Sequence, residues 1–416
     1  MTGLPQPTSA SPPASGSSLA CNGLARGHAP FLRAPEGVNT VYLVTFAAAC
    51  APLAAGVAFF GWRALVVAAL CVATCGIAEA LCYAFTRVPA LLGRSHALLT
   101  GLLLALTLPA FVPWYVSVTA SVFAIVVGKA VFGGVGHFLW QPALVGRLAV
   151  AVLFPMTLNP SAWPLLAQGH LVVGDVEQAR PAENYRGWRR AEPPGNAHAF
   201  ALPKPADTLA GLTNKDDPPF SALLFIPEGL PQAKPAALMK MAPVNDLLYG
   251  ARPGGIGETS AILILIAGLY LIYRNYVKWQ LPLAFLAAAA FVVAALPVAL
   301  ARPGDTCLTV WWPAAHEGPD VGFIYVCYQL LSSEVLLAAF FLAPEMTTRP
   351  VTAGGQIIFG AAAGGLAMIL QLYRLSPIPA YVAVLALNTF VPTIDSLWRP
   401  RVFGRPLLWR LRRKQD

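Results

Sequence analysis

The chain reads Val41-Tyr-Leu-Val-Thr-Phe-Ala-Ala-Ala-Cys-Ala-Pro-Leu-Ala-Ala-Gly-Val-Ala-Phe-Phe60, twenty residues without a charged side chain. About 20 mostly apolar residues cross the hydrocarbon core of a bilayer as an α-helix. We therefore expect this stretch to be a transmembrane helix. It begins too late and is too long for a cleavable signal peptide, so we expect it to remain in the protein as an anchor.

The whole sequence is rich in apolar residues and poor in charged ones. Of its 416 residues, 57% are hydrophobic and only 11% are charged, whereas soluble domains carry roughly 25% charged residues. About ten apolar stretches can be read as spans, of which the third and sixth are short or interrupted, and this predicts an all-α polytopic membrane protein. They are Val41–Phe60, Ala64–Phe85, Leu98–Phe111, Val116–Val135, Val145–Leu166, Ala261–Tyr273, Leu281–Leu300, Val321–Leu342, Ile357–Leu372 and Tyr381–Leu397.

The positive charge sets the orientation of these spans. The formal net charge is +9, and seven Lys and Arg residues lie between Arg399 and Lys414, with others at Arg87, Arg94, Arg274 and Lys278. Basic segments near span ends stay in the cytoplasm. With ten spans these segments share one side with the N-terminus, so both termini are predicted to be cytoplasmic, and no nucleic-acid partner is needed to explain the charge.

The chain divides into five regions. Prolines and polar residues set off a long segment between two membrane blocks, and we place it outside the cytoplasm. The tails are a Pro- and Ser-rich N-terminal stretch that we expect to be disordered and a basic C-terminal stretch. The predicted regions are 1–36 (tail), 37–166 (first membrane half), 167–257 (external loop), 258–398 (second membrane half) and 399–416 (basic tail).

Both membrane halves contain a polar break with Thr and Pro at the end of an apolar run. The first break runs from Leu98 to Pro109 and the second from Pro344 to Thr352. Broken helices at matching places in two halves are typical of inverted repeats with a substrate pathway at their interface. The alternative is that both breaks are ordinary helix ends that contain proline.

Ionisable residues inside the apolar runs are the first candidates for function, because burying charge in a bilayer is costly. We assign Glu79, Lys129, Glu334 and Glu345 to an ion pathway, and expect Thr100, Thr347 and Thr348 to shape the interface of the two halves. The alternative for the buried charges is pairs that only lock helices together. No residue is assigned a catalytic role, and the Cys and His spacings indicate no metal site.

Several longer motifs together resemble a known family. They are His96-Ala-Leu-Leu-Thr-Gly-Leu-Leu-Leu-Ala-Leu-Thr-Leu-Pro109, Phe123-Ala-Ile-Val-Val-Gly-Lys-Ala-Val-Phe-Gly-Gly-Val-Gly-His137, Gly254-Gly-Ile-Gly-Glu-Thr-Ser-Ala261, Gly355-Gln-Ile-Ile-Phe-Gly360, Asn388-Thr-Phe-Val-Pro-Thr-Ile-Asp395 and Arg399-Pro-Arg-Val-Phe-Gly404. Their order resembles the D-type subunit of the Rnf ion-translocating electron-transport complex, a relative of the B-type subunit of the Na⁺-translocating NADH:quinone oxidoreductase.

The resemblance implies a subunit of a redox-driven pump rather than a stand-alone enzyme. In the family, electrons from NADH or reduced ferredoxin pass through flavins and iron–sulfur centres in several subunits and drive Na⁺ or H⁺ across a bacterial inner membrane. Partners would be the other membrane and peripheral subunits. The resemblance places flavin near Gly257, Glu258 and Thr259, and the D-type subunit usually carries FMN on a Thr of the external loop.

At that position this chain departs from the family. Lys234 stands where the flavin-bearing Thr is expected, and an amine cannot form the hydroxyl phosphoester. Thr213 keeps part of the motif but lies about twenty residues too early. Covalent FMN is therefore not expected at Lys234, although Lys can still pair with a phosphate. Two further departures are Phe138-Leu-Trp-Gln-Pro142 and Glu334. The competing hypothesis is a flavin-free paralogue that acts as a membrane scaffold or as a channel for cations or small solutes.

Overall fold

The computed structural model describes residues 37–86, 96–158, 163–166, 180–181, 199–202, 244–250, 252, 254–300, 308–312, 319–332 and 334–398. The predicted tails, residues 1–36 and 399–416, and most of the predicted external loop lie outside these ranges. Within them the membrane part is helical, as the sequence predicts.

The first half begins with two long helices. Helix α1 (Val38–Phe60) and α2 (Trp62–Thr86) are joined at Gly61, whose φ of 75° favours glycine. Shorter helices follow: α3 (His96–Thr107), α4 (Trp114–Ile125), the π-helical turn η2 (Val126–Ala130), α5 (Pro142–Leu153) and α6 (Pro155–Leu158).

The second half has a similar series of helices. It contains α10 (Val244–Tyr249), α11 (Ala261–Tyr273), α12 (Gln280–Ala295), α14 (Pro319–Leu331), α15 (Val335–Leu337), the π-helical turn η4 (Ala338–Leu342), α16 (Ala353–Leu372) and α17 (Pro379–Leu397). A bend of 70° separates α14 from α15–η4. The eighth predicted span is therefore broken near Glu334 rather than continuous.

Each predicted span overlaps a helix, but the count of ten spans is not confirmed. Four helices, α1, α2, α16 and α17, are long and apolar enough to cross a membrane, and the bent pair α14 and α15–η4 adds a fifth if it is one span. The other apolar helices are shorter: α3, α4 with η2, α5, α11 and α12.

Prolines end two helices earlier than the hydropathy indicates. Within the fifth predicted span, Val145–Leu166, helix α5 ends at Leu153, just before Phe154-Pro155, and only the short α6 follows. Within the seventh, Leu281–Leu300, α12 ends at Ala295, before Leu296-Pro297. The residue before a proline is pushed out of the α-helical region. Leu296 accordingly has a ψ of 143°, which is extended backbone.

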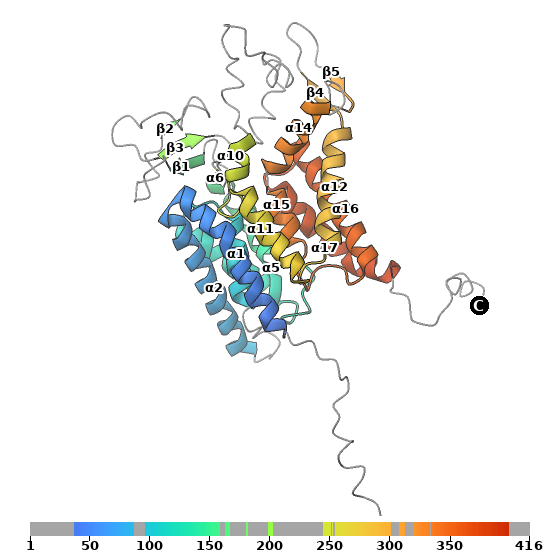
Figure 1. The fold of residues 1–416 in the computed structure, drawn as a ribbon. Helices are drawn as coiled ribbons and strands as arrows, with labels where there is room; N and C mark the ends of the chain where they lie inside the picture. Colours follow the sequence, from blue (N-terminus) through green and yellow to red (C-terminus); the bar gives the residue numbers. More distant parts are fainter. Residues whose placement is uncertain are drawn as a thin grey trace, which may run out of the picture.

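Short strands follow these helix ends. Strands β1 (Trp163–Leu166), β2 (Arg180–Pro181) and β3 (Ala199–Leu202) form a sheet in the order β1-β3-β2, in which β1 and β3 are antiparallel. Strands β4 (Val298–Leu300) and β5 (Leu308–Val310) form an antiparallel pair. Both groups lie at the same end of the helical array, opposite the end where α1 begins and α2 stops (Figure 1).

The two halves repeat the same packing. Helix α2 packs on α4 and α4 on α5, just as α12 packs on α16 and α16 on α17. Across the halves, α1 contacts α11 and α5 contacts α17, so equivalent helices meet each other. The sequence of α5 from Pro142 to Pro155 also matches that of α17 from Pro379 to Pro392 at six of fourteen positions. The predicted repeat is therefore visible in both packing and sequence.

Candidate functional site

Each half of the protein contains one short, buried half-helix. One is α3, in which every residue except Leu98 is buried, and the other is α15–η4, which is buried throughout. Buried polar side chains gather at the ends of both. The His96 cluster lies at the start of α3 and consists of Glu79, His96, Thr100, Lys129 and Glu345. The Glu258 cluster lies at the end of α3 and consists of Arg147, Arg252, Glu258, Glu334 and Tyr381.

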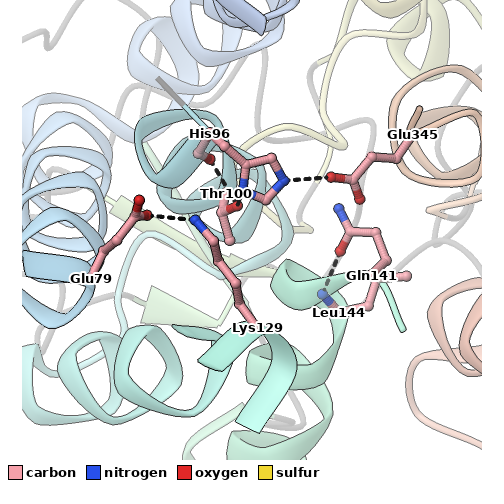
Figure 2. A network of polar contacts seen from close by, with 7 residues as sticks. All are labelled: Glu79, His96, Thr100, Lys129, Gln141, Leu144 and Glu345. Atoms are coloured by element: carbon pink, nitrogen blue, oxygen red, sulfur yellow. Dashed lines mark hydrogen bonds and ion pairs between the residues drawn. The ribbon is translucent and has the colours of Figure 1, made fainter. Parts of the chain in front are cut away.

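One ion pair and several hydrogen bonds hold the His96 cluster together (Figure 2). Lys129 Nζ donates to Glu79 Oε2 at 2.8 Å, and His96 Nε2 lies 3.0 Å from Glu345 Oε1. The Thr100 hydroxyl donates to the His96 carbonyl at 2.9 Å and lies 3.4 Å from His96 Nδ1. His96 belongs to the first half and Glu345 to the second, so this contact joins the two halves.

Local structure explains why these side chains meet. Glu79 follows Cys71 and Cys75 at intervals of four on α2, which places it on the same buried face. Lys129 lies in the π-helical turn η2, where Val131 N donates to Val126 O at 3.0 Å, and π turns frequently occur at functional sites. Lys129 is fully buried, so its ammonium group needs the Glu79 carboxylate.

The surroundings of His96 are aromatic and tightly packed. The ring of Tyr42 meets the imidazole edge-on at 5.0 Å between centroids, and Phe138 lies at 5.3 Å. Glu345 keeps one buried carboxylate oxygen, Oε2, without a hydrogen-bond partner among the residues that the structure describes. An uncompensated buried acceptor is costly, so the Glu345 carboxylate is the group of this cluster that is ready to take up a cation or a proton.

The Glu258 cluster lies at the other ends of the half-helices. Tyr381 donates its hydroxyl to Glu258 Oε1 at 2.5 Å, and the Gly255 amide donates to Glu258 Oε2 at 2.8 Å. Arg147 Nε donates to the carbonyl of Thr107, the last residue of α3, at 3.1 Å. Arg252 binds the main-chain carbonyls of Glu258 and Thr259.

Glu334 completes this cluster from the second half-helix. It is the N-cap residue of α15, where the positive end of the helix dipole favours an anion. It also interacts electrostatically with Arg147 and Tyr381. Helix α3 therefore begins in the His96 cluster and ends in the Glu258 cluster, whereas α15–η4 begins at Glu334 and is followed by Glu345. The two half-helices are antiparallel, as an inverted repeat requires.

The Gly-rich turn before α11 closes the break after α3. The Ile256 amide donates to the Leu108 carbonyl at 2.9 Å and the Gly257 amide to the Leu106 carbonyl at 2.8 Å. A Cβ added at Gly257 would lie 2.5 Å from Leu106 Cβ, so this approach requires glycine. The family resemblance places flavin near this turn; here two of its amides bind the chain's own carbonyls.

The structure brings most predicted pathway residues together, but in two groups. Glu79, Lys129, Thr100 and Glu345 share one cluster, whereas Glu334 lies in the other with Glu258. Thr347 and Thr348 are in the turn after η4, and neither hydroxyl has a hydrogen-bond partner within the described ranges. Lys234 and Thr213 lie outside the described residues.

Sequence reasoning missed three central side chains. Arg147 is 2% exposed and stands alone in an apolar run, the same signal that identified Glu79. His96 and Tyr381 carried no such signal, because a single His or Tyr at the start of a helix is ordinary. Their partners are 249 and 123 residues away in sequence.

This combination of features defines a class of membrane protein. Two inverted helical halves, antiparallel half-helices and buried charge at both ends of those half-helices are typical of proteins that move ions or small solutes. The chain matches the NQR2, RnfD, RnfE family over residues 26–404 and belongs to it.

Curated relatives cover almost the same length. The chain is 31% identical over 381 residues to the D-type subunit of the ion-translocating oxidoreductase complex of Halorhodospira halophila, which covers 91% of this chain and 95% of that protein. The D-type subunit of Stutzerimonas stutzeri is 33% identical over 353 residues, covering 84% and 87%. That of an Escherichia coli O7:K1 strain is 28% identical over 390 residues, covering 90% and 97%.

Proposed function

We propose that this chain is the D-type subunit of an ion-translocating oxidoreductase complex and that its two buried clusters are stations for the transported cation, H⁺ or Na⁺. The names of the relatives and the near-complete coverage of both chains support the first part. The second part rests on one observation: charged clusters lie at both ends of two antiparallel half-helices.

The region between the clusters suits a pump. Helix α3 has 12 residues and so separates its ends by about 18 Å. Its middle carries buried leucines: Leu102, Leu103, Leu104 and Leu106. Such an apolar layer keeps ions from leaking between the stations, so that their passage can be coupled to electron transfer by the partner subunits.

The ion pair of Glu79 and Lys129 provides the test. In vesicles that contain the assembled complex, Glu79→Gln should abolish ion uptake and also destabilise the protein, because a buried Lys129 loses its counter-charge. The double variant Glu79→Gln with Lys129→Gln should assemble normally, because two amides can hydrogen-bond to each other, yet should still not support uptake. Recovery of uptake in the double variant would show that the pair only locks helices together.

We also propose that this chain holds no covalent FMN. Lys234 cannot form the phosphoester that the family forms on Thr, while non-covalent FMN remains chemically allowed. Mass spectrometry of the 167–257 region should find no added FMN mass, and flavin fluorescence should leave this subunit on denaturation. FMN attached to Thr213 or any other residue of the region would contradict the proposal.

The competing function is a flavin-free scaffold or channel, which Lys234 favours. Ion flux through the subunit reconstituted alone, without an electron donor, would support that alternative. We further place the chain in the inner membrane of a bacterium with both termini in the cytoplasm, which the basic segments near Arg274 and Arg399 support.

A further inference from the structure

Two of the buried carboxylates, Glu79 and Glu258, already accept hydrogen bonds from neighbouring donors. Glu79 accepts from Lys129 at 2.8 Å, and Glu258 accepts from both Tyr381 and the Gly255 amide. N–H and O–H groups aimed at a carboxylate take up part of its capacity to accept. A Na⁺ ion at these positions would compete with donors that the fold itself supplies.

The main-chain carbonyl oxygens at the end of α3 also accept hydrogen bonds. Unwound carbonyls and half-helix ends are the usual ligands of Na⁺ in transporters with broken helices. Here the carbonyls of Leu106, Thr107 and Leu108 accept bonds from Gly257, Arg147 and Ile256. The guanidinium of Arg147 therefore stands where a transported cation would otherwise bind.

The His96–Glu345 pair is different, because it has an open acceptor. Glu345 Oε2 is buried and without a hydrogen-bond partner in the described ranges, while Oε1 faces His96 Nε2 at 3.0 Å. Resting on the function proposed above, we propose that the transported ion is H⁺ and that the pair of His96 and Glu345 is its binding site in the membrane.

The proton step can be written for this pair. In the deprotonated form, a neutral His96 donates its Nε2–H to the Glu345 carboxylate. The arriving proton forms an O–H bond at Oε2, and the pair changes from a net negative charge to a neutral state. When that bond breaks, the proton leaves toward the other station and the carboxylate is restored. No oxidant or reductant takes part in this step.

Other charged groups face the pair from the neighbouring elements. From α1, the Tyr42 hydroxyl interacts electrostatically with Glu345, and from η2, Lys129 does so too. Arg349, in the same turn, donates its amide to the Glu345 carbonyl at 3.3 Å. The positive charge of Lys129 near Glu345 disfavours a metal cation beside the pair.

One observation favours the competing ion. The hydroxyls of Thr347 and Thr348 also lack partners within the described ranges, and together with Glu345 they would offer oxygen ligands to Na⁺. The experiment must therefore measure both ions in the same preparation.

The test uses the complete complex in proteoliposomes driven by NADH or reduced ferredoxin, with an internal pH-sensitive dye and isotopically labelled Na⁺. Lumen acidification in Na⁺-free buffer, without Na⁺ accumulation, is the expected result. Na⁺ accumulation that persists with a protonophore would overturn the H⁺ assignment while leaving the proposed function intact. Electron transfer that moves neither ion would instead contradict the proposed function.

Variants then locate the site. Glu345→Gln and His96→Gln should each abolish acidification, whereas His137→Gln should leave it unchanged. His137→Gln is the matched control, because His137 is exposed. Acidification that survives Glu345→Gln in a properly assembled complex would refute the site. If that variant does not assemble, the ion measured with the unmodified complex still decides between H⁺ and Na⁺.

Discussion

At the scale of single residues, the buried charged side chains gather in two clusters, and each cluster contains both positive and negative groups. Arg147 shows the principle best, because the repeat provides a natural comparison. The matching position in α17 is Val384, so the same backbone site is apolar in one half and cationic in the other. The guanidinium of Arg147, which comes from the first half, interacts electrostatically with Glu258 and Glu334 of the second half.

We expect Arg147→Met to lower the free energy of unfolding by about 3–5 kcal/mol, because the substitution leaves buried carboxylates without this counter-charge. Adding Glu334→Gln should recover part of that loss. Thermal unfolding of the detergent-purified protein measures both effects, and Arg374→Met, at an exposed position, serves as the control. Equal loss at Arg147 and Arg374 would show that the cluster does not depend on Arg147.

Single residues also differ in how far their role can be predicted from the sequence. Glu79, Lys129 and Glu345 were recognisable because a charge in an apolar run is costly and therefore conspicuous. The pairing of His96 with Glu345 was not, since it depends on how two segments 249 residues apart are folded against each other.

At the scale of elements, helix ends decide where the clusters lie. The break predicted from Leu98 to Pro109 begins later than the sequence indicates, because α3 is helical as far as Thr107. The ends of α5 and α12 were placed too late because apolar composition continues past Pro155 and Pro297. The π-helical turns η2 and η4 have no clear sequence signature. The break between α14 and α15 was missed because the run from Val321 to Leu342 is apolar apart from Glu334 and a few polar neighbours.

Gly257→Ala should loosen the docking of the Gly-rich turn on α3. The new methyl group would lie 2.5 Å from Leu106 Cβ, and overpacking of this kind typically costs about 1–3 kcal/mol. Gly76→Ala is the matched control, because an added Cβ at Gly76 meets nothing within 4 Å. The unfolding midpoint should fall for the first variant only; an unchanged midpoint would mean that the turn can shift without loss.

At the scale of the whole molecule, the inverted repeat fixes which ends of the helices face which side. Met156, in α6, and Trp312, just after β5, are exposed near the end of the molecule that carries the strands. Tyr273, the last residue of α11, is also exposed. Because basic residues follow Tyr273, its end should face the cytoplasm.

In a variant without native cysteines, Met156→Cys and Trp312→Cys should react with an impermeant thiol reagent added outside the cell. Tyr273→Cys should react only in inside-out vesicles. Labelling of all three from the same side would contradict the arrangement of the two halves, and with it the placement of the clusters at opposite ends.

The shortness of α3 has an electrical consequence. A bilayer's hydrocarbon core is about 30 Å thick, but only about 18 Å of helix lies between the two charged clusters. Where polar groups replace hydrocarbon, the local field is weak, so most of the membrane voltage falls across this thin layer. In the proposed function, moving a monovalent cation across this layer takes about 2.3 kcal/mol for each 100 mV, and electron transfer in the complex would have to supply that energy.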